Sequence, residues 1–306
     1  MTFYACEWWT RVKRRCRSPI LSLDESVGAS PSMLAPERAS ELKVICDRHN
    51  LQIVIVDEPR FGIRVRLDTR EIYLPIAAME YVWAQSLRFW VVTQEYKCAQ
   101  RRGAGKFNLR GNRRLDNAAK VVEWSGRNIQ GTGKRPWPLF LPRPKKNPRD
   151  EDRQVANELF LGAMGWIILH EVGHVHFDHA EISGIYSQRQ EKDADVFATT
   201  WILDRMAETD PKFNKRIFCI AAALLCLQSF ETVAAPRWNE DHPPAHERIS
   251  YCLDRYRSAS TEKVEAFLVV CLQVLFAGTD VSPDITAQSF DDILDGLLVS
   301  ITRRNS

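Results

Sequence analysis

Short alternating runs of hydrophobic and polar residues lie in the first third of the chain. The segments Gly62–Leu67 and Glu71–Ile76 alternate and are separated by Asp68, Thr69 and Arg70, a spacing that is typical of a hairpin. A third apolar run, Leu51–Asp57, precedes them and follows a helical pattern that extends from Pro36 to His49. The pattern therefore predicts a small sheet near the N-terminus, introduced by a helix.

Beyond this sheet the hydrophobic positions recur at helical spacing. Helices are expected at 77–100, from about 159 into the stretch 166–179, at 217–227, at 264–276 and at 289–302. The apolar runs 217–227 and 264–276 are shorter than the eighteen or so residues that span a bilayer, so they are interpreted as buried core helices and no transmembrane segment is expected. The fold class predicted is α+β, mostly helical.

Composition changes the picture little. The chain of 306 residues is 45% hydrophobic and 26% charged, which is ordinary for a globular protein, and its net charge of +3 implies no polyanionic partner by itself. The 8 cysteines form no CxxC pair, which is typical of a reduced, cytoplasmic protein. The apolar residues at the N-terminus precede the positive charges, the reverse of a secretory signal.

Three regions are expected from composition shifts. Residues 1–35 form a flexible or loosely packed arm, because 18–36 is rich in Ser, Pro, Gly and Ala. Residues 36–150 form an N-terminal α+β region with basic loops, and residues 151–306 form a helical catalytic domain.

Two basic segments interrupt the middle of the chain, between positions 97 and 149. They are rich in Lys and Arg and are expected to be irregular: 97–115 contains no acid, and the run around 134–149 is rich in proline. A solvated insertion is the simpler interpretation. The aromatic residues Phe107, Trp137 and Phe140 among these charges leave open a nucleic-acid surface or a docking site for an acidic protein.

The stretch WIILHEVGHVHFDH, from Trp166 to His179, contains the main candidate metal-binding and catalytic residues. His170 and His174 are four residues apart, so on a helix they project from nearly the same side and can offer two imidazole nitrogens to one ion. Glu171 is one position off that line, which suits a base that contacts the attacking water. The other two histidines of the stretch, His176 and His179, do not share the face of the pair and are expected to be exposed or to support the ligands from outside.

A catalytic zinc normally has three protein ligands and one open position. Glu191 is the best third ligand, because EKDAD opens an amphipathic helix on which Glu191, Ala194, Asp195 and Ala198 share a face. Two alanines there would let this helix pack closely on the first, and Asp195 would accept the second ring N–H of a ligand histidine. The simpler interpretation is that these acids form the solvated start of a helix.

HEVGH followed by EKDAD resembles the gluzincin metallopeptidases, which have HExxH and ExxAD motifs and include the prenyl-protease type. The later sequence HPPAHERI, from His242 to Ile249, matches their third motif, HP…R. Among soluble bacterial members the chain is similar to the Lit-type phage-exclusion peptidase family. The resemblance covers roughly residues 155–255.

The resemblance implies a zincin-like domain that binds one catalytic Zn²⁺. It implies the following roles: ligands His170, His174 and Glu191, base Glu171, outer support from Asp195, oxyanion support from His242, and bracing of that region by Arg248. Independently, a tetrahedral intermediate needs a donor aimed at its negative charge. His242 and His246 compete for that task, and His242 could instead be a turn residue held before two prolines.

The function expected is that of a cytoplasmic zinc endopeptidase acting on a protein substrate, with phage exclusion or host-protein cleavage implied by the resemblance. An edge strand of the small sheet is a candidate for pairing with the substrate backbone. The alternative is a zinc-containing regulatory or nucleic-acid-binding protein that uses the basic segments 97–149. The sequence does not specify the substrate, an activating partner or the oligomeric state.

Overall fold

The structure is a computed structural model that describes residues 18–104, 107–132, 136–179, 187–232, 242–256, 262–279, 281 and 289–305. The α-helices are α1 (Asp24–Leu34), α2 (Ala39–His49), α3 (Ile76–Arg101), α4 (Arg113–Ile129), α5 (Glu151–His176), α6 (Gln188–Leu203), α7 (Pro211–Glu231), α9 (Ala245–Leu253), α10 (Glu262–Leu275) and α11 (Phe290–Asn305). The strands are β1 (Gln52–Val56), β2 (Arg64–Arg66) and β3 (Glu71–Pro75), and short 3₁₀ helices lie at Pro19–Leu23, Pro36–Arg38 and Asp254–Tyr256.

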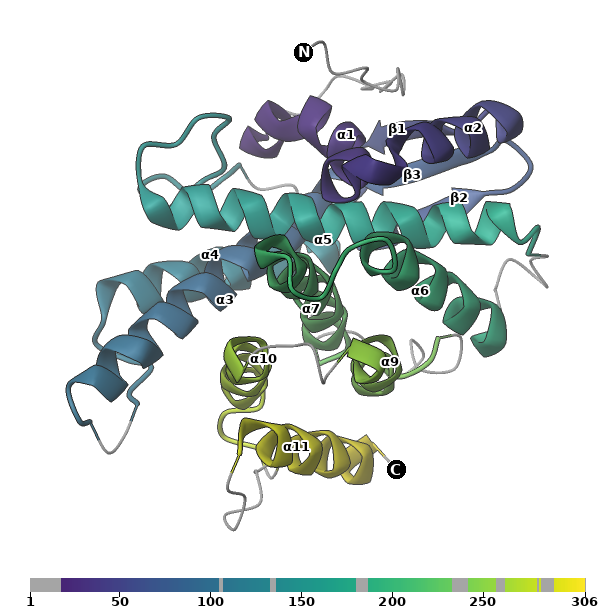
Figure 1. Ribbon diagram of the computed structural model, residues 1–306. Helices are drawn as coiled ribbons and strands as arrows, with labels where there is room; N and C mark the ends of the chain where they lie inside the picture. The colour runs from purple at the N-terminus through teal and green to yellow at the C-terminus, as the bar shows by residue number, and fades with distance from the viewer. Residues whose placement is uncertain are drawn as a thin grey trace.

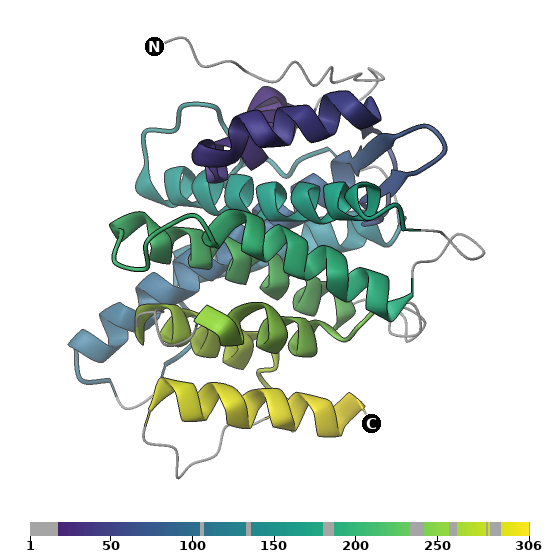
Figure 2. The same cartoon turned by 45° about the vertical axis from the view of Figure 1, so that its right-hand side comes forward.

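Helix α5 runs through the middle of the molecule, and helices pack around it (Figure 1). It contacts α1, α3, α6 and α7, and eighteen of its residues are buried. The layers are clear in Figure 2, where the N-terminal helices lie on one side of α5 and α10 and α11 lie farthest away on the other. A helix buried on nearly all sides is apolar all round, which explains its weak amphipathic pattern in sequence.

The small sheet has the strand order β1-β3-β2. Strands β1 and β3 are parallel, with Ile53 opposite Ile72, and β2 and β3 form the antiparallel hairpin that the alternating pattern predicts, with Val65 opposite Ile72. Strand β2 is therefore an edge strand, and it contacts α5. The predicted mostly helical α+β class with a small N-terminal sheet is confirmed.

The expectation of a loose arm over 18–36 is wrong for the residues that the structure describes. Helix α1 and the 3₁₀ turn before it bury Ile20, Leu23 and Val27, each at most 2% exposed, and α1 packs on α5. Apolar residues at helical spacing outweigh the Ser, Pro and Gly content here. Residues 1–17 lie outside the described residues.

The basic segments are less irregular than expected. Arg101 ends α3, and Arg113 and Arg114 begin α4, whose N-cap is Asn112. The guanidinium of Arg114 contacts Glu95 and Asp152, so acids that are distant in sequence neutralise it. Lys106, Lys134 and Arg135 lie outside the described residues.

Two helices, α5 and α7, are long and apolar enough by composition to cross a membrane, although the apolar run in α7 was expected to be too short. Their most apolar windows are 83% and 78% buried inside the protein, as is usual for core helices. They are therefore weak evidence of a membrane span.

The domain boundary expected at residue 150 stays a prediction. One cluster of buried side chains contains residues from elements before and after this position.

Candidate metal centre

The C-terminal end of α5 presents three buried polar side chains. The helix begins at its N-cap Asp150, whose carboxylate accepts from the backbone N–H of Arg153, and it continues without a break to the HEVGH sequence. His170, Glu171 and His174 are 6%, 6% and 1% exposed. The two histidines turn their Nε2 atoms toward each other, 3.1 Å apart, as their four-residue spacing predicts.

Helix α6 brings Glu191 to the same point. A capping box between Ser187 and Gln190 starts the helix just before Glu191, which is 2% exposed. One carboxylate oxygen of Glu191 lies 3.5 Å from His170 Nε2, and the other lies 3.5 Å from His174 Nε2. The glutamate is thus part of a buried group and does not form a solvated helix start.

The close approach of α5 and α6 depends on small residues. A Cβ atom at Gly173 would lie 3.2 Å from Ala194 Cα and 3.1 Å from Phe197 Cδ1, tighter than most Cβ contacts. The space that Gly173 leaves is therefore occupied by a neighbouring segment, and Ala194 and Ala198 of α6 are both fully buried. This packing is what brings Glu191 within reach of the histidines.

The donor set fits a zinc ion. The ligating atoms of His170, His174 and Glu191 all lie within 4.8 Å of one another. Zinc with bonds of about 2.0–2.1 Å places tetrahedral ligand atoms about 3.3 Å apart, close to the observed spacings of 3.1 and 3.5 Å. Two imidazoles and one carboxylate, with no fourth ligand grouped with them among the described residues, match the three-ligand pattern that catalytic zinc sites have in other proteins.

The electrostatics of the group also favour a cation. Burial alone would raise the pKa of Glu191, but contacts with three histidines hold that pKa well below its usual range. Burial would likewise lower the pKa of His170, but hydrogen bonds to Asp195 and Glu191 raise it to about 10. The ionised Glu191 and the anionic partners of His170 favour a positive charge at this point, whether it is a proton or a metal ion.

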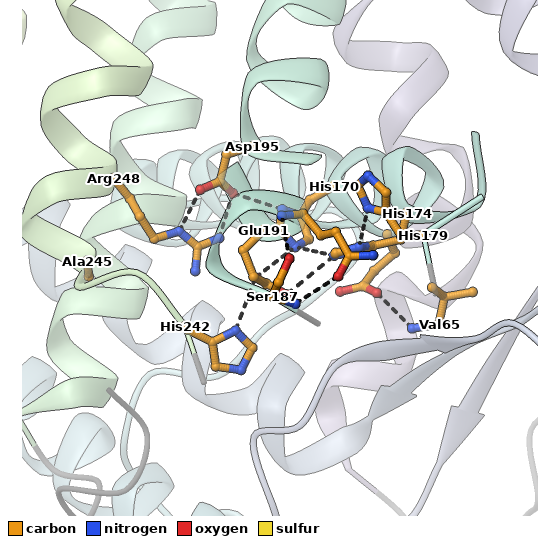
Figure 3. A network of polar contacts seen from close by, with 12 residues as sticks. Val65, His170, His174, His179, Ser187, Glu191, Asp195, His242, Ala245 and Arg248 are labelled. Carbon is orange, nitrogen blue, oxygen red and sulfur yellow. Dashed lines mark hydrogen bonds and ion pairs between the residues drawn. The ribbon is translucent and has the colours of Figure 1, made fainter. Parts of the chain in front are cut away.

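Asp195 lies behind His170, as expected from the ExxAD spacing. Its Oδ1 is 2.8 Å from His170 Nδ1 and accepts from Arg248 Nη2 at 2.6 Å, while Oδ2 accepts from Arg248 Nε at 2.7 Å (Figure 3). Tyr251 also donates to Oδ2. The aspartate is fully buried, so these partners replace its lost hydration.

Tyr251 was missed by the sequence analysis. It lies on α9 three residues after Arg248, and that spacing puts both side chains on one face of the helix. The HP…R motif identified Arg248 but carried no signal for the tyrosine. An amphipathic reading of α9 would have placed the two together.

Glu171 contacts the small sheet. Its Oε2 accepts from the backbone N–H of Val65 in β2 at 2.7 Å (Figure 3). Burial, the largest influence, raises the pKa of Glu171 to about 7, and Glu191 adds to the increase, while His170 and the Val65 N–H oppose it. A carboxylate with a pKa near neutrality suits proton transfer.

The two histidines of the HPPAHERI motif occupy different places. His242 lines the pocket, and its Nδ1 is 3.0 Å from Glu191 Oε2. His246 is buried in α9, 3% exposed, and does not line this pocket. Of the two competing candidates, only His242 is placed to contact a ligand in the pocket.

The pocket beside this group has a volume of about 90 Å³. Its lining combines polar and apolar side chains, and the polar ones are His170, Glu171, His174, Glu191, His242 and Arg248. The apolar ones are Phe61, Ile63, Trp166, Ile167 and Leu227, and Arg64 of β2 also lines the pocket. A polypeptide backbone with an apolar side chain matches such a mixed lining.

The other two histidines of the stretch 166–179, His176 and His179, lie in different environments. His176 is exposed, whereas His179 is 7% exposed and its Nδ1 lies 3.0 Å from Nδ1 of His174. His179 thus faces the outer side of a candidate ligand and does not join the ligand group.

Comparison with known proteins points in one direction. Residues 72–268 match the peptidase U49 family. The cell death peptidase of Escherichia coli (strain K12) is 39% identical over 295 residues, which cover 95% of this chain and 99% of that protein. No solved structure gives a significant match.

Proposed function

The chain belongs to the peptidase U49 family, and from this premise we propose that it is a zinc-dependent endopeptidase. The observation that carries the proposal is the buried convergence of His170, His174 and Glu191 with a carboxylate, Glu171, next to it. The Lit-type resemblance of the sequence motifs agrees with this family.

In the proposed reaction each side chain has one task. His170, His174 and Glu191 hold the zinc, which when bound supplies a Lewis acid for the substrate carbonyl and lowers the pKa of water. Glu171 takes a proton from the water whose oxygen attacks the carbonyl carbon. Glu171 then returns this proton to the amide nitrogen as the C–N bond breaks, so that an acid and an amine are released.

Two further residues assist the proposed reaction in different ways. His242 lies on the pocket side of Glu191, where an imidazole can donate to the oxyanion of the tetrahedral intermediate. Arg248 donates two hydrogen bonds to Asp195 and thereby holds it in place against His170. Arg248 is accordingly a positioning residue in this proposal.

The substrate is proposed to be a protein that binds in an extended form. Strand β2 is an edge strand, and Val65 places its backbone beside Glu171. An added peptide strand could pair with this edge and cross the pocket. Cleavage of a host protein in the cytoplasm, as in phage exclusion, is part of the proposal and depends on the sequence resemblance.

The test separates metal binding from proton transfer. Glu171→Gln should retain zinc, because residue 171 is not a ligand, while cleavage falls by a factor of about 10² to 10⁴. His170→Ala should lose both zinc and cleavage. Zinc content is measured on the purified proteins, and cleavage is measured as new peptide termini in cells that express each variant.

Glu158→Gln is the matched control, since Glu158 is an exposed residue of the same helix that pairs with Lys215. It should behave as the wild type in both measurements. Wild-type cleavage in cells that express Glu171→Gln or His170→Ala contradicts the proposed function.

A further inference from the structure

The chain reverses sharply where α5 ends. Asp178 has a left-handed conformation (φ 51°), its N–H donates to Val175 O at 3.2 Å, and His179 N donates to His174 O at 3.0 Å. These two bonds form a Schellman motif, in which the second residue past the cap returns over the last turn of the helix. The motif therefore brings His179 back against His174, the candidate ligand.

The side chains of this pair meet as well as their backbones. Nδ1 of His179 is 3.0 Å from Nδ1 of His174, and the rings meet edge to face with centroids 5.2 Å apart. A Schellman motif usually has an apolar contact at this point. Here a polar contact replaces it, in a place where His179 is only 7% exposed.

The position of His179 is fixed from a second side. The ring of Phe177 stacks on it at 5.4 Å with an interplanar angle of 24°. The backbone bond holds the main chain of His179 over the last turn of α5, and the imidazole would lose its contact with the Phe177 ring if the side chain rotated away. The contact between the two histidines is thus built into the end of the helix.

The contact allows only two arrangements of protons when both rings are neutral. Nε2 of His174 faces His170 and Glu191, so it must be free of a proton if it is to bind a metal ion. The proton of His174 then lies on Nδ1 and is donated to Nδ1 of His179. In the reverse arrangement His179 donates, the proton of His174 moves to Nε2, and the metal-facing nitrogen is blocked.

We propose that His179 is a positioning residue that accepts the Nδ1 proton of His174 and so keeps the Nε2 atom of His174 available to the metal. It would do for His174 what Asp195 does for His170, with an imidazole in place of a carboxylate. This inference rests on the proposed zinc site. Partners of this kind typically change metal affinity by about 10- to 100-fold.

The test measures zinc affinity by competition with a chromogenic chelator, on the full chain. His179→Leu removes the acceptor and places an apolar residue where the Schellman motif prefers one, so the helix end should remain folded. We expect zinc affinity to fall by about 10- to 100-fold. His179→Gln keeps an acceptor oxygen and should restore most of the wild-type affinity.

His176→Leu is the matched control, because His176 is an exposed histidine of the same helix end. It should bind zinc as the wild type does. Equal affinities for wild type and His179→Leu overturn the inference, as do equal losses in His179→Leu and His179→Gln. Failure of the wild type itself to bind zinc would instead remove the proposed function.

Discussion

The two walls of the pocket are built in different ways. One wall comes from α5 and α6, whose ligand candidates lie within 21 positions of each other, between 170 and 191, and are held by partners inside the protein. The other wall comes from β2 and from the segment before α9, and in the part of the chain that the structure describes two polar contacts join it to the first wall. These are the Val65 N–H to Glu171, across 106 positions, and His242 to Glu191.

The difference suggests a division of labour. The helical wall is buried and its donor atoms already have the spacing of a metal site. Little free energy is therefore needed to rearrange these side chains when an ion binds. The second wall includes Arg64 and His242, which are partly exposed and can contact a substrate. Changes in the first wall should therefore affect metal binding and folding, and changes in the second should affect turnover.

Asp195→Asn should have the largest effect on the helical wall. It leaves the buried guanidinium of Arg248 without its counter-charge, and removal of one partner of a buried ion pair costs about 3–5 kcal/mol. Zinc affinity should fall as well, because His170 loses its anionic partner. Thermal denaturation and chelator competition measure the two effects.

Asp193→Asn provides the comparison, because it removes an exposed acid from the same helix two residues away. It should leave stability and zinc affinity nearly unchanged. If Asp195→Asn were equally harmless, the helical wall would not depend on this network.

The helical wall was predictable from the sequence. The four-residue spacing of His170 and His174 and the small residues around Glu191 report local helix geometry, which needs no knowledge of distant contacts. The main prediction, that two imidazoles and a carboxylate from the next helix converge, agrees with the observed geometry. The sheet and the helices α2, α3, α7, α10 and α11 were likewise visible as periodic patterns.

The second wall was not predictable in the same way. The contact of Val65 with Glu171 uses a backbone N–H, which leaves no signature in the side chains.

Helix α1 was not predicted because its Ser, Pro and Gly content resembles that of a linker, while its burial depends on packing against α5. Such contacts are determined by tertiary packing, which overrides local composition.

Val65→Pro tests the contact between the second wall and the base. The Val65 N–H is directed to Glu171, so proline at this edge position removes the donor to the base and leaves the strand able to pair with β3 through its neighbours. A hydrogen bond to a charged group is worth about 1.5–3 kcal/mol, so kcat should fall by about 10- to 100-fold. Zinc content should stay constant.

Val65→Ala is the control for this change, since it also removes the buried valine side chain but keeps the N–H. It should retain most of the wild-type kcat even if it lowers the melting temperature. A similar loss of kcat in both variants would mean that side-chain packing, and not the hydrogen bond, connects the sheet to the base.

The smallest effect is expected at Glu231, which ends α7 and accepts the N–H of Ala245, the first residue of α9, at 2.7 Å. Burial raises the pKa of Glu231 to about 7, although this N–H and the charge of Arg248 oppose the increase. Because the unfolded chain loses this proton near pH 4.5, the folded protein binds more protons between these values, and its free energy of unfolding decreases as the pH rises from about 4.5 to 7.

Glu231→Gln should therefore flatten the decrease in melting temperature between pH 5 and pH 8, because glutamine keeps the acceptor but has no charge to bury. The difference should be about 1–3 kcal/mol, since a tenfold change in acidity corresponds to about 1.4 kcal/mol and partial solvation reduces the total. Glu247→Gln, an exposed change on α9, should keep the wild-type slope. Identical slopes in the wild type and both variants would show that the contact between α7 and α9 does not titrate in this pH range and contributes nothing to the pH dependence of stability.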